Sequence, residues 1–139
     1  MAEAIFKNMI KESGLNLDDY VIESAATSRE EIGNDIYPPA KHCMDAHGIP
    51  YQFRAAHQIT PADYDKFDYI ICMDENNIRN LQRIISSDPD HKISKMLDWA
   101  HPDYIHGRKA DVADPWYTGN FEKTYEDIVA GCRGFLEHI

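Results

Sequence analysis

The stretch Phe67-Asp-Tyr-Ile-Ile-Cys-Met-Asp-Glu75 decides the fold class of this 139-residue chain. Its apolar centre has the length and composition of a strand buried inside a sheet, and Asp74 stands where a following helix over residues 75–85 needs an N-cap. A strand end, an acid and a helix start in this order are typical of the carboxyl edge of a parallel sheet, where ligands bind. We therefore expect an α/β fold in which Asp74 and the loop after Ser24 face one site.

Helical and extended patterns alternate on both sides of this strand. We expect helices over residues 2–13, 38–48, 60–66 and 121–138, extended runs over 20–26, 51–56 and 95–99, and a loop over 101–119. The alternation predicts helices packed against a parallel sheet. It opens with a helix, however, where a doubly wound sheet normally opens with a buried strand and a phosphate-binding turn.

Length, charge and cysteine content restrict the class of protein. A chain of 139 residues fits one domain over residues 1–139, and a formal net charge of -10 makes nucleic acid an unlikely partner. We find no apolar run typical of a membrane span or a signal peptide. The three cysteines are an odd set without CxxC spacing, so we expect buried thiols and a reducing, cytoplasmic location.

Several short segments together resemble one enzyme family. They are Met1-Ala-Glu-Ala-Ile-Phe-Lys7, Ser24-Ala-Ala-Thr-Ser28, Glu31-Ile-Gly-Asn34, His47-Gly-Ile-Pro50, Gln58-Ile-Thr60, the stretch from Phe67 to Asn76, and Asp114-Pro-Trp-Tyr117. Their order and spacing are similar to those of the low-molecular-weight protein tyrosine phosphatases, over nearly the whole chain. The resemblance implies a three-layer α/β/α sandwich with a parallel sheet, and hydrolysis of phosphotyrosine or aryl phosphate monoesters through a phosphocysteine.

The family's nucleophilic loop is absent from the sequence. Members begin with a strand and a Cys-x-x-x-x-x-Arg-Ser loop directly before the segment matched by Met1. The sixth residues after the three cysteines, Cys43, Cys72 and Cys132, are Ile49, Ile78 and His138, so the motif occurs nowhere in the chain. We therefore expect a domain that is N-terminally truncated relative to the family, with its first strand missing, and an inactive chain. Unpaired sheet backbone would favour a homodimer or strand exchange.

The resemblance assigns one catalytic residue and three pocket residues. Asp114 matches the general acid that protonates the leaving oxygen, although an isolated Asp-Pro pair usually only starts a turn. Trp116 and Tyr117 match aromatic residues at the mouth of the substrate pocket, and Tyr117 also resembles a family phosphorylation site. Glu30 falls where some relatives have a pocket aromatic, and a solvated surface glutamate is the simpler interpretation.

Two further residues match the family positions that support the loop. Ser24 corresponds to a serine behind the loop, and Asp74 to an acid at the end of the neighbouring strand. A hydrogen bond to local backbone would also explain Ser24, and an N-cap would explain Asp74. With the loop arginine absent, the remaining carboxylates Asp74, Glu75 and Asp114 are expected to repel a phosphate dianion.

We expect no cofactor and no metal. His42 and His47, like His101 and His106, are five residues apart, whereas metal-binding pairs on a helix are usually four apart. Three other functions stay open: a pseudophosphatase that binds a partner, an arsenate reductase-like member of the same fold, and a phosphoacceptor domain using Asp74. If the loop were supplied, the partner would be a phosphotyrosine protein or a small aryl phosphate.

Overall fold

Two short parallel strands lie at the centre of the structure, a computed structural model that describes residues 1–28, 33, 35–52, 55–115 and 119–139. Strand β1 (Ile70–Cys72) pairs with β2 (Ile93–Lys95), with Ile70 opposite Ile93 and Cys72 opposite Lys95. An isolated parallel bridge joins Ala26 to Gln58. The strand predicted from the apolar stretch at residues 67–73 is therefore present, and its carboxyl end leads directly to Asp74.

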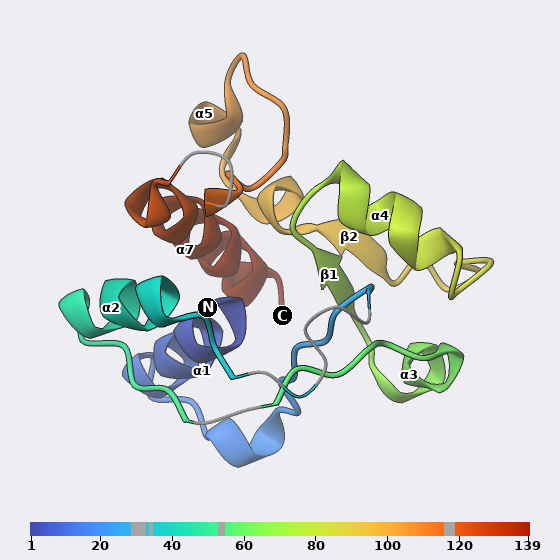
Figure 1. Ribbon diagram of the computed structural model, residues 1–139, viewed down its shortest axis with the longest axis horizontal. Helices are drawn as coiled ribbons and strands as arrows, with labels where there is room; N and C mark the ends of the chain where they lie inside the picture. The colour runs from blue at the N-terminus through green and yellow to red at the C-terminus, as the bar shows by residue number, and fades with distance from the viewer. Residues whose placement is uncertain (29–32, 34, 53–54, 116–118) are drawn as a thin grey trace.

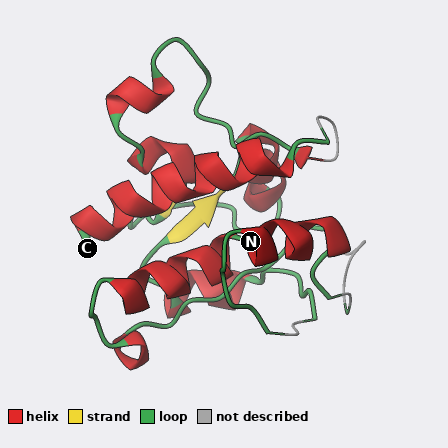
Figure 2. Ribbon diagram, turned by 90° about the vertical axis from the view of Figure 1, so that its left-hand side faces the viewer, coloured by secondary structure: helices red, strands yellow, loops and turns green. Residues whose placement is uncertain are grey.

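Successive side chains of β1 point to opposite faces of the sheet, and each face is covered by its own hydrophobic core. Ile71 packs against a large core that contains Ile5, Met44 and Ile128. Ile70 and Cys72 belong to a smaller core with Leu81. Figures 1 and 2 show the result: α1, α2 and α7 lie on one side of the strands, and α3 and α4 on the other. This is an α/β/α arrangement of three layers.

The helices begin and end largely where capping residues and apolar stripes predict. In the part of the chain that the structure describes, they include α1 (Ala2–Glu12), α2 (Pro38–Ala46), α3 (Pro61–Lys66), α4 (Glu75–Gln82), α5 (Pro102–Ile105) and α7 (Phe121–His138), with two 3-10 helices, η1 (Leu17–Asp19) and η2 (Met96–Trp99). Among the described helices, none combines the length and the apolarity that crossing a membrane requires.

Helix α7 packs closely on η2 because two of its positions are glycine. A Cβ atom on Gly134 would lie 1.6 Å from the backbone oxygen of Trp99, and one on Gly131 would lie 2.5 Å from that of Met96. No side chain fits at these positions. Gly131 and Gly134 therefore set the distance between the closing helix and the segment that follows β2.

The structure differs from the sequence-based expectations in four segments. Of the extended run expected over residues 51–56, the described residues belong to neither strand. Residues 20–26 form no extended strand, and only Ala26 pairs there, because a strand requires a neighbour to complete its hydrogen bonds. The strand expected over residues 95–99 ends at Lys95 and continues as η2, where the Asp98 carboxylate accepts a hydrogen bond from the Lys95 backbone N–H. The loop expected over 101–119 contains α5, which starts at Pro102.

Candidate active site

Asp74 fixes the junction between β1 and α4. Its side chain accepts a hydrogen bond from the backbone N–H of Asn77 at 2.8 Å, and the Asn77 side chain accepts one from the N–H of Met73 at 3.0 Å. The two bonds satisfy donors on both sides of the turn. The expected N-cap is confirmed, and the end of the strand is held in one conformation by neighbouring side chains.

The segment leading to Asp114 is attached to this strand end and to α7. The N–H of Val112 donates to the carbonyl of Met73 at 2.9 Å, and the carbonyl of Ala113 accepts from the Thr124 hydroxyl at 2.6 Å. The Ala113 N–H in turn donates to the Asp127 carboxylate at 3.0 Å. The backbone directly before Asp114 is therefore anchored from two sides.

Asp127 is the centre of this anchorage, and its side chain is completely buried. The Arg108 guanidinium donates to both carboxylate oxygens at 2.9 and 3.1 Å, and the Tyr104 hydroxyl donates at 2.5 Å. Burial works to raise the pKa of Asp127, but the hydrogen bonds from Arg108, Tyr104 and Ala113 outweigh it and hold that pKa below its ordinary value. The ionised carboxylate is thus stabilised in the interior.

Asp74 and Asp114 line the same cavity, which has a volume of about 670 Å³. A smaller cavity of about 210 Å³ is also lined by both residues, together with Thr124 and Ile128 of α7. The structure thus places the expected general acid and the expected loop-supporting acid together. Their catalytic roles stay predictions. Glu30, Trp116 and Tyr117, the expected pocket residues, lie outside the described residues.

The larger cavity carries more charge than the sequence indicated. Besides Asp74, Glu75 and Asp114 it is lined by Asp111 and by three cations, Arg79, Lys95 and Lys109. The expectation of a purely acidic cluster was therefore incomplete, because the cations are contributed by three separate segments of the chain. Four carboxylates against three cations still leave the lining acidic.

One of these cations, Lys95, is bridged between two acids. Its ammonium lies 3.1 Å from an oxygen of Asp111 and 3.4 Å from one of Glu75. Burial acts to lower the pKa of Lys95, but the hydrogen bonds and charges of Asp111 and Glu75 outweigh it and raise that pKa above its usual value. The charge of Lys95 is therefore already compensated within the protein.

Ser24 is not among the described residues that line either cavity. Its hydroxyl donates to the Glu3 carboxylate at 3.1 Å, and the other oxygen of Glu3 pairs with Lys7 at 2.8 Å. The contact joins the segment before Ala26 to the first turn of α1. Ser24 thus bonds to a side chain distant in sequence, and the family role in supporting a loop stays a prediction.

None of the three cysteines is a reactive thiolate. Cys43, Cys72 and Cys132 are all buried and free. Burial raises the pKa of Cys72 to about 11, to which the Asp74 charge contributes, and raises that of Cys132 to about 12. Burial together with the Glu122 charge raises the pKa of Cys43 to about 11. At neutral pH these thiols are protonated, so none of them replaces a catalytic cysteine.

Sequence reasoning missed Asp127 and Arg108. Asp127 lies on the buried face of α7, three residues after Thr124 and four before Gly131. A signal was present, because an acid on the apolar stripe of a helix requires a buried partner. Lys123, four residues earlier on the same helix and 3.5 Å away, is at a spacing that the sequence shows. The sequence could not show Arg108, which comes from an irregular segment.

Comparison with known proteins agrees with this fold. The sequence model of the family described as low molecular weight phosphotyrosine protein phosphatase matches residues 1–139. The human enzyme of that name is 37% identical over 139 residues, which cover 99% of this chain and 85% of the relative. The corresponding chicken protein is 39% identical over 140 residues, with the same coverage.

A solved structure gives the same result in three dimensions. The crystal structure of YfkJ from Bacillus subtilis superposes with a TM-score of 0.87 at 34% identity, covering 99% of this chain and 84% of that one. The YfkJ sequence is named a low molecular weight protein-tyrosine-phosphatase. The three-layer α/β/α fold with a parallel sheet is thereby confirmed. This chain belongs to the low molecular weight phosphotyrosine protein phosphatase family.

Proposed function

We propose that residues 1–139 contain the general acid of a phosphotyrosine phosphatase site, Asp114, and that they do not by themselves hydrolyse phosphate esters. The observation that supports this proposal is the pairing of Asp114 with Asp74 on one cavity, in a chain whose three thiols are all buried. The chain contains no Cys-x-x-x-x-x-Arg sequence. The acid is therefore present and the nucleophile is not.

The chemistry of the family explains why both parts are needed. A thiolate attacks phosphorus, a sulfur–phosphorus bond forms, and the bond to the leaving phenol oxygen breaks as an acid protonates that oxygen. Water then hydrolyses the phosphocysteine, and the conjugate base of the same acid accepts a proton. In this chain Asp114 would perform the two proton transfers, because it follows a backbone segment held by Thr124 and Asp127.

The charges of the cavity support the proposal for the isolated chain. A phosphate dianion requires backbone N–H groups and an arginine that are free to bind it. Lys95 already pairs with Glu75 and Asp111, and four carboxylates line the cavity. The residues present therefore favour no tightly bound dianion at this position.

The substrate of the site, once a loop is supplied, would be a phosphotyrosine protein or a small aryl phosphate. This part of the proposal rests on the names of the relatives, which describe phosphotyrosine protein phosphatases. Trp116, Tyr117 and Glu30 are the residues that we propose contact the aryl group. The larger cavity next to Asp114 has room for such a group.

The test compares two forms of the protein with para-nitrophenyl phosphate. One form is the chain itself, and the other is extended at Met1 by an apolar strand and a Cys-x-x-x-x-x-Arg-Ser loop. We expect turnover from the extended form alone, and we expect its loss when the loop cysteine is replaced by serine. In the extended form Asp114→Asn should lower turnover by about 100-fold or more.

A second substrate isolates the role of Asp114. Phenyl phosphate has a more basic leaving group than para-nitrophenyl phosphate, so it depends more on protonation. The loss caused by Asp114→Asn should therefore be larger with phenyl phosphate. A folded extended form without turnover would overturn the proposal and favour a pseudophosphatase that binds a partner. Turnover by the short chain that Asp114→Asn abolishes would also overturn the proposal, because it would show that residues 1–139 are active by themselves.

A further inference from the structure

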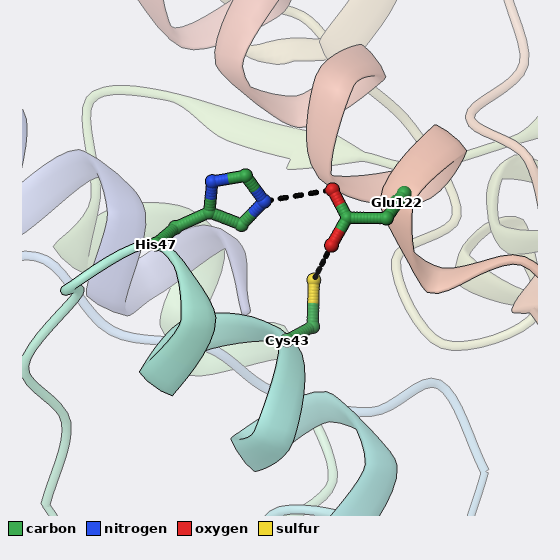
Figure 3. A group of neighbouring side chains, drawn as sticks. All are labelled: Cys43, His47 and Glu122. Carbon is green, nitrogen blue, oxygen red and sulfur yellow. Dashed lines mark hydrogen bonds and ion pairs between the residues drawn. The ribbon is translucent and has the colours of Figure 1, made fainter.

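A second group of chemically active side chains lies on the helical layer formed by α2 and α7. Cys43 and His47 are four residues apart at the end of α2, and Glu122 is in the first turn of α7 (Figure 3). One ligand atom from each residue lies within 4.8 Å of the other two. The fold thus brings together a thiol, an imidazole and a carboxylate from two separate helices.

The three side chains already share one set of contacts. One oxygen of Glu122 lies 2.7 Å from Nε2 of His47, and the other accepts a hydrogen bond from the Cys43 thiol at 3.6 Å. Figure 3 shows both side chains of α2 directed toward the Glu122 carboxylate. The donor atoms therefore converge on one point instead of pointing to solvent in different directions.

The His47 ring is held in the orientation that this convergence requires. It stacks on the ring of Tyr125, with the ring centres 3.7 Å apart and the planes 9° from parallel. Cys43 is buried, whereas His47 and Glu122 are exposed, so a small ion could enter from solvent and reach the sulfur. A buried thiol and a stacked imidazole next to an exposed carboxylate suit a site for a small ion.

We propose that Cys43, His47 and Glu122 form a binding site for a thiophilic divalent cation, with Zn²⁺ as the best match. Thiolate, imidazole and carboxylate are the three ligand types that zinc uses in proteins. Cys43 and His47 have the i, i+4 spacing that places two ligands on one face of a helix. The sequence analysis compared only histidine pairs, both five residues apart. It therefore overlooked the pairing of His47 with a cysteine.

One of the distances already matches a tetrahedral zinc ion, and a second would have to lengthen. Two ligand atoms of such an ion lie roughly 3.3 to 3.6 Å apart, given bond lengths of about 2.0 to 2.3 Å. The sulfur and the nearer Glu122 oxygen are separated by 3.6 Å. The shorter 2.7 Å contact of His47 is a hydrogen bond that the ion would replace, after a small rotation of the exposed Glu122 side chain. Water would complete the fourth position.

Metal binding would have a simple structural effect. The ion displaces the Cys43 thiol proton to solvent and joins the end of α2 to the start of α7 through three bonds. It also compensates the Glu122 charge, which together with burial raises the pKa of Cys43 to about 11 in the metal-free protein. The site lies on residues other than those that line the Asp114 cavity, so it is independent of the proposed phosphatase function.

Titration of the untagged chain with Co²⁺ tests the proposal, because a cobalt–thiolate bond gives a charge-transfer absorption band. We expect the band to saturate at one equivalent and to disappear when Zn²⁺ is added. Glu122→Gln and His47→Gln should each weaken Co²⁺ binding by at least about 10-fold, and Cys43→Ser should abolish the band. Both Glu122 and His47 are exposed, so the first two variants are expected to fold.

Matched controls come from the same elements. His42→Gln changes an exposed histidine next to Cys43, Glu126→Gln an exposed glutamate one turn after Glu122, and Cys72→Ser a buried cysteine in β1. All three should bind Co²⁺ as the parent chain does. As a second readout, Zn²⁺ should raise the melting temperature of the parent chain, and at the same Zn²⁺ concentration it should raise that of Glu122→Gln by less.

The opposite results would overturn the assignment. A parent chain without a saturable cobalt–thiolate band, or with a band that survives Cys43→Ser, has no metal at this place. Equal binding by Glu122→Gln and Glu126→Gln would show that the carboxylate is no ligand. These readouts need no phosphatase activity, so they distinguish a failure of the metal site from a failure of the proposed function.

Discussion

The Arg108 guanidinium binds the buried Asp127 carboxylate through two hydrogen bonds of 2.9 and 3.1 Å, and this pair anchors the backbone that leads to Asp114. Arg108 also donates to the carbonyl of Asp111 at 3.0 Å. Asp127 accepts from the N–H of Ala113. One ion pair thus connects the closing helix α7 to the irregular segment that carries the expected general acid.

Asp127→Asn should destabilise the protein by about 3 kcal/mol, because it leaves the Arg108 charge without its counterion. The value is at the lower end of the usual range since Arg108 keeps partial contact with solvent. Chemical denaturation measures the free energy of unfolding. Glu126→Gln, on the exposed face of the same helix, should change it by less than about 0.5 kcal/mol. Equal stability of the two variants would contradict the anchoring role.

The same carboxylate predicts how stability depends on pH. The folded-state pKa of Asp127 is held below its ordinary value of 3.8, so the unfolded chain binds a proton more readily. Asp127 therefore stabilises the fold above its unfolded pKa, and this contribution is lost as pH falls from about 5 through the folded pKa. Melting temperatures between pH 7 and pH 3 should fall less steeply in Asp127→Asn than in the parent chain. Parallel curves would show that Asp127 has the same pKa in both states.

Gly134→Ala should destabilise the protein, although alanine favours a helix by about 1 kcal/mol over glycine. The added Cβ would meet the backbone oxygen of Trp99 at 1.6 Å, which forces η2 and α7 apart. We expect a loss of about 1 to 3 kcal/mol or more in denaturant unfolding. Arg133→Ala, at the exposed neighbouring position, is the control and should be nearly neutral. A stabilised Gly134→Ala variant would refute the close packing of α7 on η2.

Asp74→Ala should cost about 1 kcal/mol of stability, because α4 loses its N-cap. Asp74→Asn keeps an oxygen that accepts the hydrogen bond from the Asn77 N–H, and it should cost less. Thermal unfolding of both variants, with the exposed Asp68→Ala as a control, measures the difference. If alanine and asparagine were equivalent, the observed hydrogen bond would contribute nothing.

The three cysteines should react slowly with a disulfide reagent in the native protein. Their pKa values are about 11 to 12, so at pH 8 roughly a thousandth or less of each thiol is thiolate. All three side chains are also buried. In guanidinium chloride all three should react within the mixing phase of the experiment. A thiol that reacts rapidly in the folded chain would reveal a nucleophile that the structure does not show.

Much of the fold follows from local patterns. The apolar run at residues 67–73 predicts the strand at Ile70–Cys72, and the stripe of α7 predicts a helix over Phe121–His138. Asp74, directly after the strand, predicts that a helix begins at the next residue. These features depend only on residues that are close in sequence, so a local pattern is enough to place them.

The contacts between distant segments could not be predicted in this way. Asp127 meets Arg108 only because the segment before Asp114 folds back on α7. Lys95 meets Asp111 only because β2 ends beside that segment. In the same way, Glu122 approaches Cys43 through the packing of two helices whose relative position no local pattern determines. The expected homodimer or strand exchange also stays a prediction.

Calorimetric titration of the folded chain with tungstate, a mimic of the phosphate dianion, tests most directly whether residues 1–139 contain a phosphate-binding site. We expect no saturable binding, because the cavity lining is acidic and Lys95 is already paired. The form extended by a cysteine loop should bind one equivalent. Stoichiometric binding of tungstate by residues 1–139 alone would show that they contain a phosphate-binding site after all.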